Sequence, residues 1–180
     1  MSLHQGIIGM SRSGKSTLGK WWANQLKKRG RRIVVLDPMG DLAWSRVADV
    51  ATKDPLQFLA IAQHNQSCHL FADEWGISVG PHAREFDWLG TTARHHGHTV
   101  WVIAHRWQQI STTLRDNIGR AFLFGQGVKS AALVSEEFAK PQLAAQLPTL
   151  ESGKFIEVER CRADIRSGKI NFGTKSVKLA

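Results

Sequence analysis

The chain has 180 residues, of which 42% are hydrophobic and 22% are charged, and its formal net charge is +9. This length and composition favour one globular domain over residues 1–180 and exclude a disordered or fibrous protein. Two cysteines, no signal-peptide pattern and no apolar run of membrane-spanning length favour a reducing compartment without stable membrane insertion. The positive charge favours a polyanionic partner, with nucleic acid ahead of an anionic membrane.

Short apolar runs alternate with helical patterns along the chain. The apolar runs predict strands at residues 4–9, 33–36, 69–72, 99–104, 120–124 and 154–159. The helical patterns cover residues 14–29, 41–50, 55–64 and 84–96, and Gly30 and Gly97 are expected to end two of them. Strands separated by helices are typical of an α/β protein with a mainly parallel central sheet flanked by helices. The last 30 residues alternate polar and apolar side chains, which predicts a C-terminal edge strand or hairpin.

A glycine-rich loop of the pattern GxxxxGK[ST] follows the first apolar run and opens the first helix. Its glycines let backbone N–H groups turn inward around phosphate oxygens, and the helix N-terminus adds a positive dipole end. We expect Lys15 to reach the β- and γ-phosphates of ATP and the Ser16 hydroxyl to ligate Mg²⁺. The alternative is a glycine-rich turn with a surface lysine. The predicted nucleotide-binding residues are Gly9, Ser11, Arg12, Ser13, Gly14, Lys15, Ser16 and Thr17.

Two carboxylates end the strand predicted at residues 69–72. Asp73 is placed to hold Mg²⁺, and Glu74 to act as the general base that polarises a water in line with the γ-phosphate. A kinase needs no such base for water, so the pair favours nucleotide hydrolysis. The next strand ends at His105, where a polar side chain can sense the γ-phosphate, because ligands bind at the carboxyl ends of parallel strands. A solvated acidic turn and a structural histidine are the alternatives.

Four stretches together resemble the FtsK–HerA superfamily of P-loop ATPases, which are ring-shaped DNA motors of the additional-strand (ASCE), RecA-like division. They are GMSRSGKST, VVLDPMGDL, HLFADE and the long stretch from TTARHHG to LRDN, and LPTLESGKFIEV resembles the family's terminal strand. The resemblance implies a P-loop NTPase fold and an ATPase that uses Mg²⁺. The family commonly has glutamine at the sensor position, where this chain has His105, with Gln108 and Gln109 just beyond.

Within that superfamily, the chain is most similar to the genome-packaging ATPases of membrane-containing tailless icosahedral viruses. This resemblance implies a motor that drives double-stranded DNA into a preformed capsid. It implies a homo-oligomeric ring, a hexamer or pentamer, that meets capsid or portal-vertex proteins in the host cytoplasm or at the virion's packaging vertex. It also implies an arginine supplied by the neighbouring subunit. Arg94 is the first candidate and Arg115 the second, ahead of Arg84 and Arg120.

Two basic clusters are candidates for sequence-independent contact with DNA phosphates. The denser one lies at the predicted end of the first helix, where cations also match the helix dipole. The other lies on the late strands. Their members are Lys27, Lys28, Arg29, Arg31 and Arg32 in the first, and Arg160, Arg162, Arg166 and Lys169 in the second.

Three other functions compete with the packaging motor. A small-molecule P-loop kinase fits the length, but it needs a mobile lid with several arginines, for which we see no insertion. An ATP-dependent assembly or secretion protein of a filamentous phage fits the superfamily, but such proteins normally carry a membrane span. A non-enzymatic nucleic-acid-binding module fits the charge and leaves both nucleotide motifs unexplained.

Overall fold

The computed structural model describes residues 4–174 and 176–179, and these residues are built around one sheet of nine strands. The strand order is β3-β2-β4-β5-β1-β6-β7-β8-β9. The strands are β1 (His4–Ile8), β2 (Arg32–Leu36), β3 (Val50–Thr52), β4 (Cys68–Ala72), β5 (Thr99–Ala104), β6 (Ile118–Leu123), β7 (Lys154–Glu159), β8 (Arg166–Asn171) and β9 (Ser176–Leu179).

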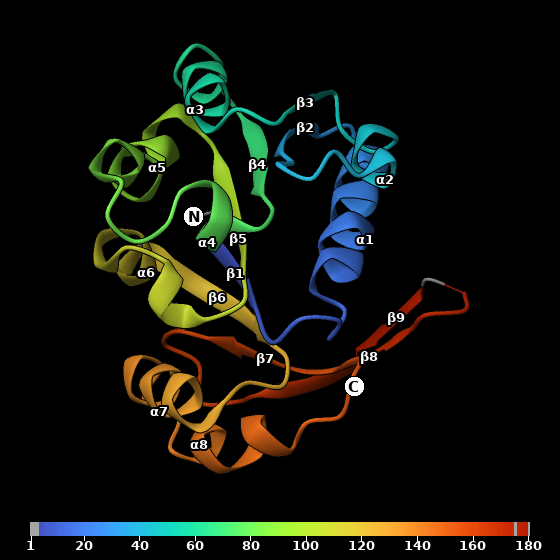
Figure 1. The fold of residues 1–180 in the computed structure, drawn as a ribbon, viewed down its shortest axis with the longest axis vertical. Coiled ribbons are helices and arrows are strands. Elements are labelled where there is room, and N and C mark those ends of the chain that lie inside the picture. The colour runs from blue at the N-terminus through green and yellow to red at the C-terminus, as the bar shows by residue number, and fades with distance from the viewer. Residues whose placement is uncertain (1–3, 175, 180) are drawn as a thin grey trace.

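Six of these strands form the parallel part of the sheet, from β3 at one edge to β6. The strands β7, β8 and β9 then extend the sheet with antiparallel pairs, so that the chain ends in a β8–β9 hairpin at the other edge (Figure 1). The expected mainly parallel α/β sheet and the expected terminal hairpin are both confirmed.

Helices cover both faces of the parallel part. In Figure 1, α1 and α2 lie on one side of the parallel strands, and α3, α5 and α6 lie on the other. The longer helices are α1 (Lys15–Lys28), α3 (Pro55–Gln63) and α7 (Val128–Glu137), and the shorter ones are α2 (Leu42–Ser45), α4 (Trp75–Ser78), α5 (Asp87–Thr91), α6 (Thr112–Asn117), α8 (Gln142–Gln146), η1 (Arg84–Phe86), η2 (Ala93–His96), η3 (Trp107–Gln109) and η4 (Leu147–Thr149).

The apolar strands are buried on both faces, as expected of central parallel strands. Neighbouring residues of one strand enter opposite clusters: Ile7 belongs to the cluster under α1, and Ile8 to the cluster on the other face. Among the described residues, no helix combines the length and the apolar character that crossing a bilayer requires.

The helix expected over residues 41–50 is wrong beyond its first turn. It ends at Ser45, and the chain then runs beside β2 as the short edge strand β3, which the sequence did not predict. Asp49 causes the change: its backbone N–H donates to the Ile33 carbonyl at 2.8 Å, and its carboxylate accepts from the Ile33 N–H at 2.7 Å. These two bonds place the following residues in the sheet.

The single helix expected over residues 84–96 is three short helical segments, η1, α5 and η2, which end at Gly97. The Thr91 hydroxyl donates to the Asp87 carbonyl at 3.0 Å, one turn back. Such bonds bend helices. Helices α6, α7 and α8 occupy stretches in which the sequence pattern predicted no helix.

Candidate nucleotide-binding site

The loop of residues 9–14 joins the end of β1 to the start of α1 and is held in place by the C-terminal part of the chain. The Gly153 N–H donates to the Ser13 carbonyl at 3.0 Å. The Ser152 hydroxyl donates to the Arg12 carbonyl, also at 3.0 Å. The segment that leads into β7, the first antiparallel strand, is therefore hydrogen-bonded to the loop that follows the parallel strand β1.

Glycine is required at two positions of this loop. A Cβ at Gly9 would lie 2.5 Å from the Phe124 Cβ, which real structures do not allow, and Gly14 has a φ of 110°. Gly14 is the N-cap residue of α1, and no side chain caps the helix there. The first N–H groups of a helix have no partner within it, and together with the dipole they attract anions. The loop thus fits a phosphate group.

Lys15 lies beneath this loop with 5% of its surface exposed. Its Nζ atom donates to the Met10 carbonyl at 2.9 Å and lies 3.3 Å from His105 Nδ1. Burial lowers the pKa of Lys15, while the carboxylates of Glu74 and Asp73 act in the opposite direction. The ammonium is therefore placed between the loop and two acids, where a phosphate chain would meet it.

Asp73 follows β4 and accepts hydrogen bonds from both sides of the site. Ser16 Oγ donates to its Oδ1 at 3.1 Å, and Trp44 Nε1 donates to its Oδ2 at 2.7 Å. Burial raises the pKa of Asp73, while the Trp44, Glu74 and Ser16 hydrogen bonds oppose that rise. A hydroxyl beside a carboxylate is the oxygen donor set that Mg²⁺ prefers. The residues present therefore fit the magnesium site expected at Ser16 and Asp73.

The sequence did not single out Trp44 as a site residue, and contacts within the DPMGDLAW stretch and with α1 hold it in place. Asp37 closes the turn by accepting from the Gly40 N–H at 3.1 Å. Asp41 caps α2 by accepting from the Ala43 N–H at 2.8 Å, and it also pairs with Lys20 of α1. These contacts direct Trp44 from α2 toward Asp73.

Glu74 and His105 face one another across the site. His105 Nε2 lies 2.6 Å from Glu74 Oε2, and each side chain is only partly exposed. Glu74 adopts a left-handed backbone conformation with φ 50° and ψ 43°, which is uncommon for a residue with a side chain and concentrates at functional sites. The Lys15 ammonium can only donate, so His105 Nδ1 accepts from it and Nε2–H donates to Glu74.

Gln109 holds the backbone of the sensor position. Its Oε1 atom accepts from the N–H groups of His105 and Arg106, each at 3.0 Å. Gln108, the other glutamine near the sensor, is exposed. Of the three candidates for the sensor, His105 is the one whose side chain reaches Lys15 and Glu74, and Gln109 acts through the backbone.

Six of the eight predicted nucleotide-binding residues, together with Glu74 and His105, line one pocket of about 380 Å³, a volume within the range of small-molecule sites. Gly9, Ser13 and Asp73 are not among its lining residues. Two residues that the sequence did not single out, Ile77 and Phe172, also face it. The lining is Ser11, Arg12, Gly14, Lys15, Ser16, Thr17, Met39, Glu74, Ile77, His105 and Phe172. The structure therefore brings together both motifs and the sensor candidate.

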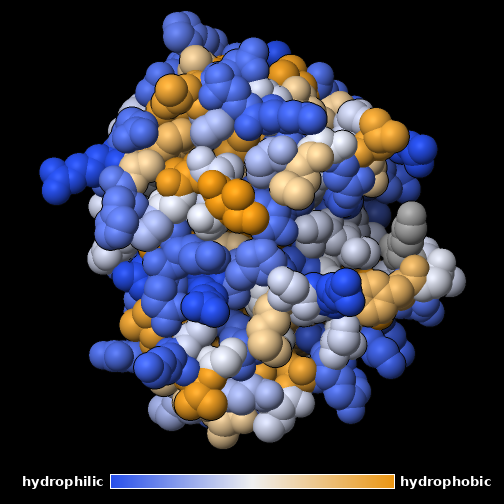
Figure 2. Space-filling model, in the orientation of Figure 1, coloured by the Kyte–Doolittle hydropathy of each residue, from blue (hydrophilic) through white to orange (hydrophobic). Residues whose placement is uncertain are grey.

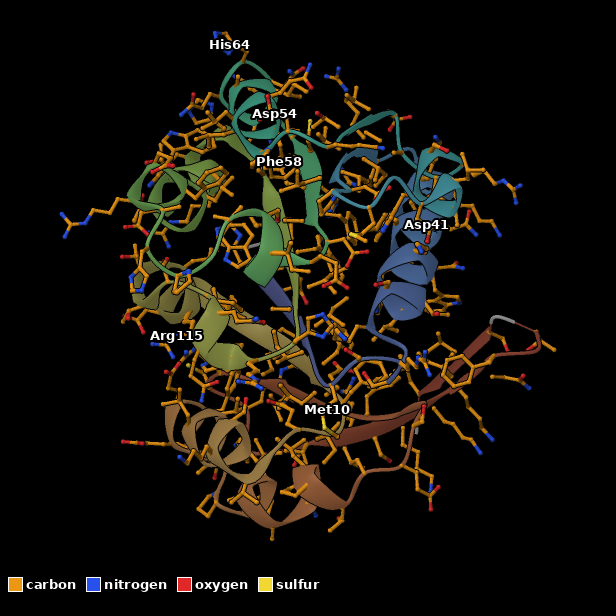
Figure 3. All side chains as sticks on the ribbon, in the orientation of Figure 1. Met10, Asp41, Asp54, Phe58, His64 and Arg115 are labelled. Carbon is orange, nitrogen blue, oxygen red and sulfur yellow. The ribbon has the colours of Figure 1, made fainter. Side chains whose placement is uncertain are left out.

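The candidate arginines lie outside this pocket. Arg94 is exposed on η2, before β5. Arg115 on α6, labelled in Figure 3, pairs with Glu137 at 3.1 Å, and its side chain is 14% exposed. Arg84 is exposed, whereas Arg120 pairs with Glu157 at 2.5 Å. Arg115 and Arg120 are thus already engaged by carboxylates of their own chain.

The late-strand basic cluster is smaller than the sequence suggested. The Arg160 guanidinium donates to the carbonyls of Ile118, Glu137 and Arg115. Arg162 pairs with Glu159 at 3.2 Å. Two members of the cluster are therefore already bonded within the chain.

A histidine-rich stretch precedes β5. Within it, His98 is buried and bonds to the Ala62 carbonyl and the Cys68 N–H. The described part of the chain contains no group of three or more side chains suited to holding a metal by themselves.

No protein-family model and no curated protein matches the sequence. Solved structures do match the fold. The genome-packaging NTPase B204 of Sulfolobus turreted icosahedral virus 2, in complex with AMPPCP, is 14% identical, with a TM-score of 0.74 over 99% of this chain and 96% of that chain. VirB4 of Thermoanaerobacter pseudethanolicus is 10% identical, with a TM-score of 0.68 over 88% of this chain and 87% of that chain.

The pCW3 conjugation coupling protein TcpA is 18% identical, with a TM-score of 0.64, and the match covers 92% of this chain but 59% of that chain. At these identities the likeness concerns the fold. The chain therefore has the P-loop NTPase fold of these proteins, and the expected resemblance to FtsK–HerA-type ATPases is confirmed at that level.

Proposed function

We propose that this chain is an ATP-hydrolysing motor that moves double-stranded DNA, and that it packages a viral genome into a preformed capsid. The observation that carries the proposal is that Lys15, Ser16 and Glu74 line one pocket beside His105, and that Ser16 donates a hydrogen bond to Asp73. The phosphate-loop motif and the acidic pair thus lie side by side, which supports a hydrolytic site in which Glu74 would act as the general base.

Each residue has a distinct role in this proposal. Mg²⁺, when bound, neutralises charge that develops on the phosphates, and Ser16 and Asp73 would hold it. Lys15 and the N–H groups at the start of α1 bind the phosphate chain. Glu74 takes the proton of the attacking water. His105 orients the Glu74 carboxylate through Nε2–H.

The direct test replaces the base without changing its shape. In Glu74→Gln we expect ATP binding to persist while phosphate release falls by about 10²–10⁴, the usual contribution of a general base. Glu85→Gln, a change of the same kind at an exposed glutamate of η1, should keep the wild-type rate. Wild-type turnover in Glu74→Gln would remove Glu74 from the mechanism, and absence of phosphate release by the wild type would contradict the hydrolytic function.

A row of lysines supports a polyanionic partner. In the antiparallel register of β7, β8 and β9, Lys154 stands opposite Lys169, and Lys169 stands opposite Lys178. Like charges directly opposite on neighbouring strands are destabilising, so such a row needs a compensating benefit. Among the described residues, Lys154 pairs with Glu151 at 2.9 Å, and no ion pair is recorded for the other two lysines. Duplex DNA, with its regularly spaced phosphates, would supply the missing anions.

Paired charge reversals distinguish the lysine row on β7, β8 and β9 from the basic cluster at the C-terminal end of α1 as the DNA-binding surface. We expect Lys169→Glu with Lys178→Glu to weaken duplex-DNA binding and to flatten its dependence on salt. Lys28→Glu with Arg29→Glu, at the C-terminal end of α1, is the matched variant. DNA binding that responds only to the α1 pair would move the contact to that surface, and binding that responds to neither would argue against a DNA motor.

The ring and its partners belong to the same proposal. Arg94 is exposed and so can reach a neighbouring subunit. Capsid or portal-vertex proteins would be the ring's binding partners in the host cytoplasm or at the packaging vertex.

DNA transfer in conjugation is the second candidate function, because the conjugation coupling protein TcpA shares the fold. The coverage favours packaging, since the match spans 96% of the B204 chain but 59% of the TcpA chain.

A further inference from the structure

Phe172 is an exposed aromatic residue at the mouth of the phosphate pocket. It follows β8 and has 48% of its surface exposed, so the core does not explain it. Figure 2 shows hydrophobic residues on the β8–β9 hairpin among hydrophilic surroundings. The Phe172 ring nevertheless lies close to the loop. A Cβ built at Gly14 would lie only 3.3 Å from the Phe172 Cζ atom.

The sheet order places Phe172 on one flank of the phosphate loop and the hydrolytic residues on the other. The loop follows β1; Glu74 and His105 follow β4 and β5, on one side of β1 in the sheet. Phe172 follows β8, on the other side (Figure 1). The γ-phosphate has to face Glu74, and so the nucleoside end of an extended nucleotide points toward Phe172.

Space for a nucleoside is present at that end. Thr17 and Phe172 line the phosphate pocket and also line an adjoining pocket of about 720 Å³, which extends along α1 past Trp21 and Asn24 to α2. The two pockets thus share the walls formed by Thr17 and Phe172. A ligand with an anionic end and a flat aromatic end fits this pair, and Asn24 supplies an amide for the edge of a base.

We propose that Phe172 is the stacking platform for the nucleotide base, so that the β8–β9 hairpin completes the ATP site. The proposal rests on the proposed ATPase function. Every base has a π-face, and stacking on an aromatic side chain contributes about 1–3 kcal/mol. The phenyl ring therefore adds affinity for the nucleoside and none for the phosphate chain.

The test compares ATP with inorganic tripolyphosphate, each titrated calorimetrically into the full chain with Mg²⁺. In Phe172→Ala we expect ATP to bind about 5-fold to 150-fold more weakly, the range that follows from the stacking energy, and tripolyphosphate to bind as in the wild type. Phe172→Tyr keeps an aromatic ring and should bind ATP as the wild type does. Leu56→Ala removes an exposed apolar side chain of α3 that lines neither pocket, and it should leave both affinities unchanged.

Three results would overturn the inference. Equal loss of ATP and tripolyphosphate affinity would mean that Phe172 only supports the loop at Gly14. Unchanged ATP affinity in Phe172→Ala would place the base elsewhere, and absence of ATP binding by the wild type would overturn this inference and the proposed function together. ATP that binds with the expected discrimination but is not hydrolysed would contradict the proposed function alone.

Discussion

His105 connects Lys15 and Glu74: its Nδ1 atom lies 3.3 Å from Lys15 Nζ and its Nε2 atom 2.6 Å from Glu74 Oε2. A single neutral ring satisfies both contacts, because one nitrogen accepts and the other donates. Glu74, the proposed base, and Lys15, the proposed phosphate-binding residue, are therefore connected through one side chain.

Removing this link should affect turnover more than binding. In His105→Ala we expect kcat to fall about 10-fold or more, because Glu74 loses the group that orients it, while ATP affinity changes little. His105→Gln should retain more activity than His105→Ala, since an amide can also accept and donate. Steady-state phosphate release and calorimetric ATP titration separate the two effects. A rise in KM at constant kcat would make His105 a binding residue instead.

Trp44 should set the pH range in which the site works. Burial already raises the pKa of Asp73, and the Trp44 hydrogen bond lowers it. Trp44→Phe removes that bond, so the pKa of Asp73 rises further and the ionised form that holds Mg²⁺ is lost at higher pH. We expect the acid limb of the kcat/KM profile to move to higher pH and the Mg²⁺ requirement to increase.

The control for this variant is a second buried tryptophan. Trp75 is 1% exposed, and its indole Nε1 makes no hydrogen bond in the described structure. Trp75→Phe removes a similar volume without removing a donor to Asp73. An equal shift of the acid limb in Trp75→Phe would attribute the effect to packing.

Gly76 provides a test of Gln109 as a positioning residue. A Cβ at Gly76 would lie 2.3 Å from the Gln109 Cδ atom, so Gly76→Ala displaces the amide that holds the His105 and Arg106 N–H groups. We expect kcat to fall while ATP affinity is kept. Gly127→Ala, where a Cβ has open space, is the matched control and should keep wild-type kinetics. Lost ATP affinity in Gly76→Ala would show a wider disturbance of the loop.

The sequence predicted the parts of the site that follow from local patterns. Lys15, Ser16, Asp73, Glu74 and His105 each lie at the end of a strand or the start of a helix, and parallel strands bring such ends together. Their contacts could therefore be inferred without knowledge of the packing. Their roles in catalysis stay predictions.

The residues that the sequence did not reveal depend on contacts across the fold. Trp44 donates to Asp73 from α2, and the ion pair between Asp41 and Lys20 holds the start of α2 against α1. Phe172 reaches the loop because the antiparallel strands extend the sheet to that side. Asp49 ends a helical pattern by pairing with Ile33, a tertiary contact that overrides local propensity. No local spacing encodes any of these three relationships.

Buried histidines should make the fold sensitive to mild acid. Burial lowers the pKa of His4 and of His69 to about 4, and each accepts a hydrogen bond on Nδ1, from the Val100 N–H and the Trp101 indole, respectively. A histidine with a lowered folded pKa is protonated first in the unfolded chain. Stability is therefore fully present above the unfolded pKa of about 6.5 and is lost as pH falls toward 4.

We expect the free energy of unfolding to fall between pH 7 and about pH 4.5, with His4 alone contributing about 3 kcal/mol once the pH reaches its folded pKa. His4→Gln should remove much of that difference when urea unfolding is measured at both pH values. His64→Gln changes an exposed histidine at the edge of the molecule (Figure 3) and should leave the difference intact. An unaltered pH difference in His4→Gln would show that His4 does not carry it.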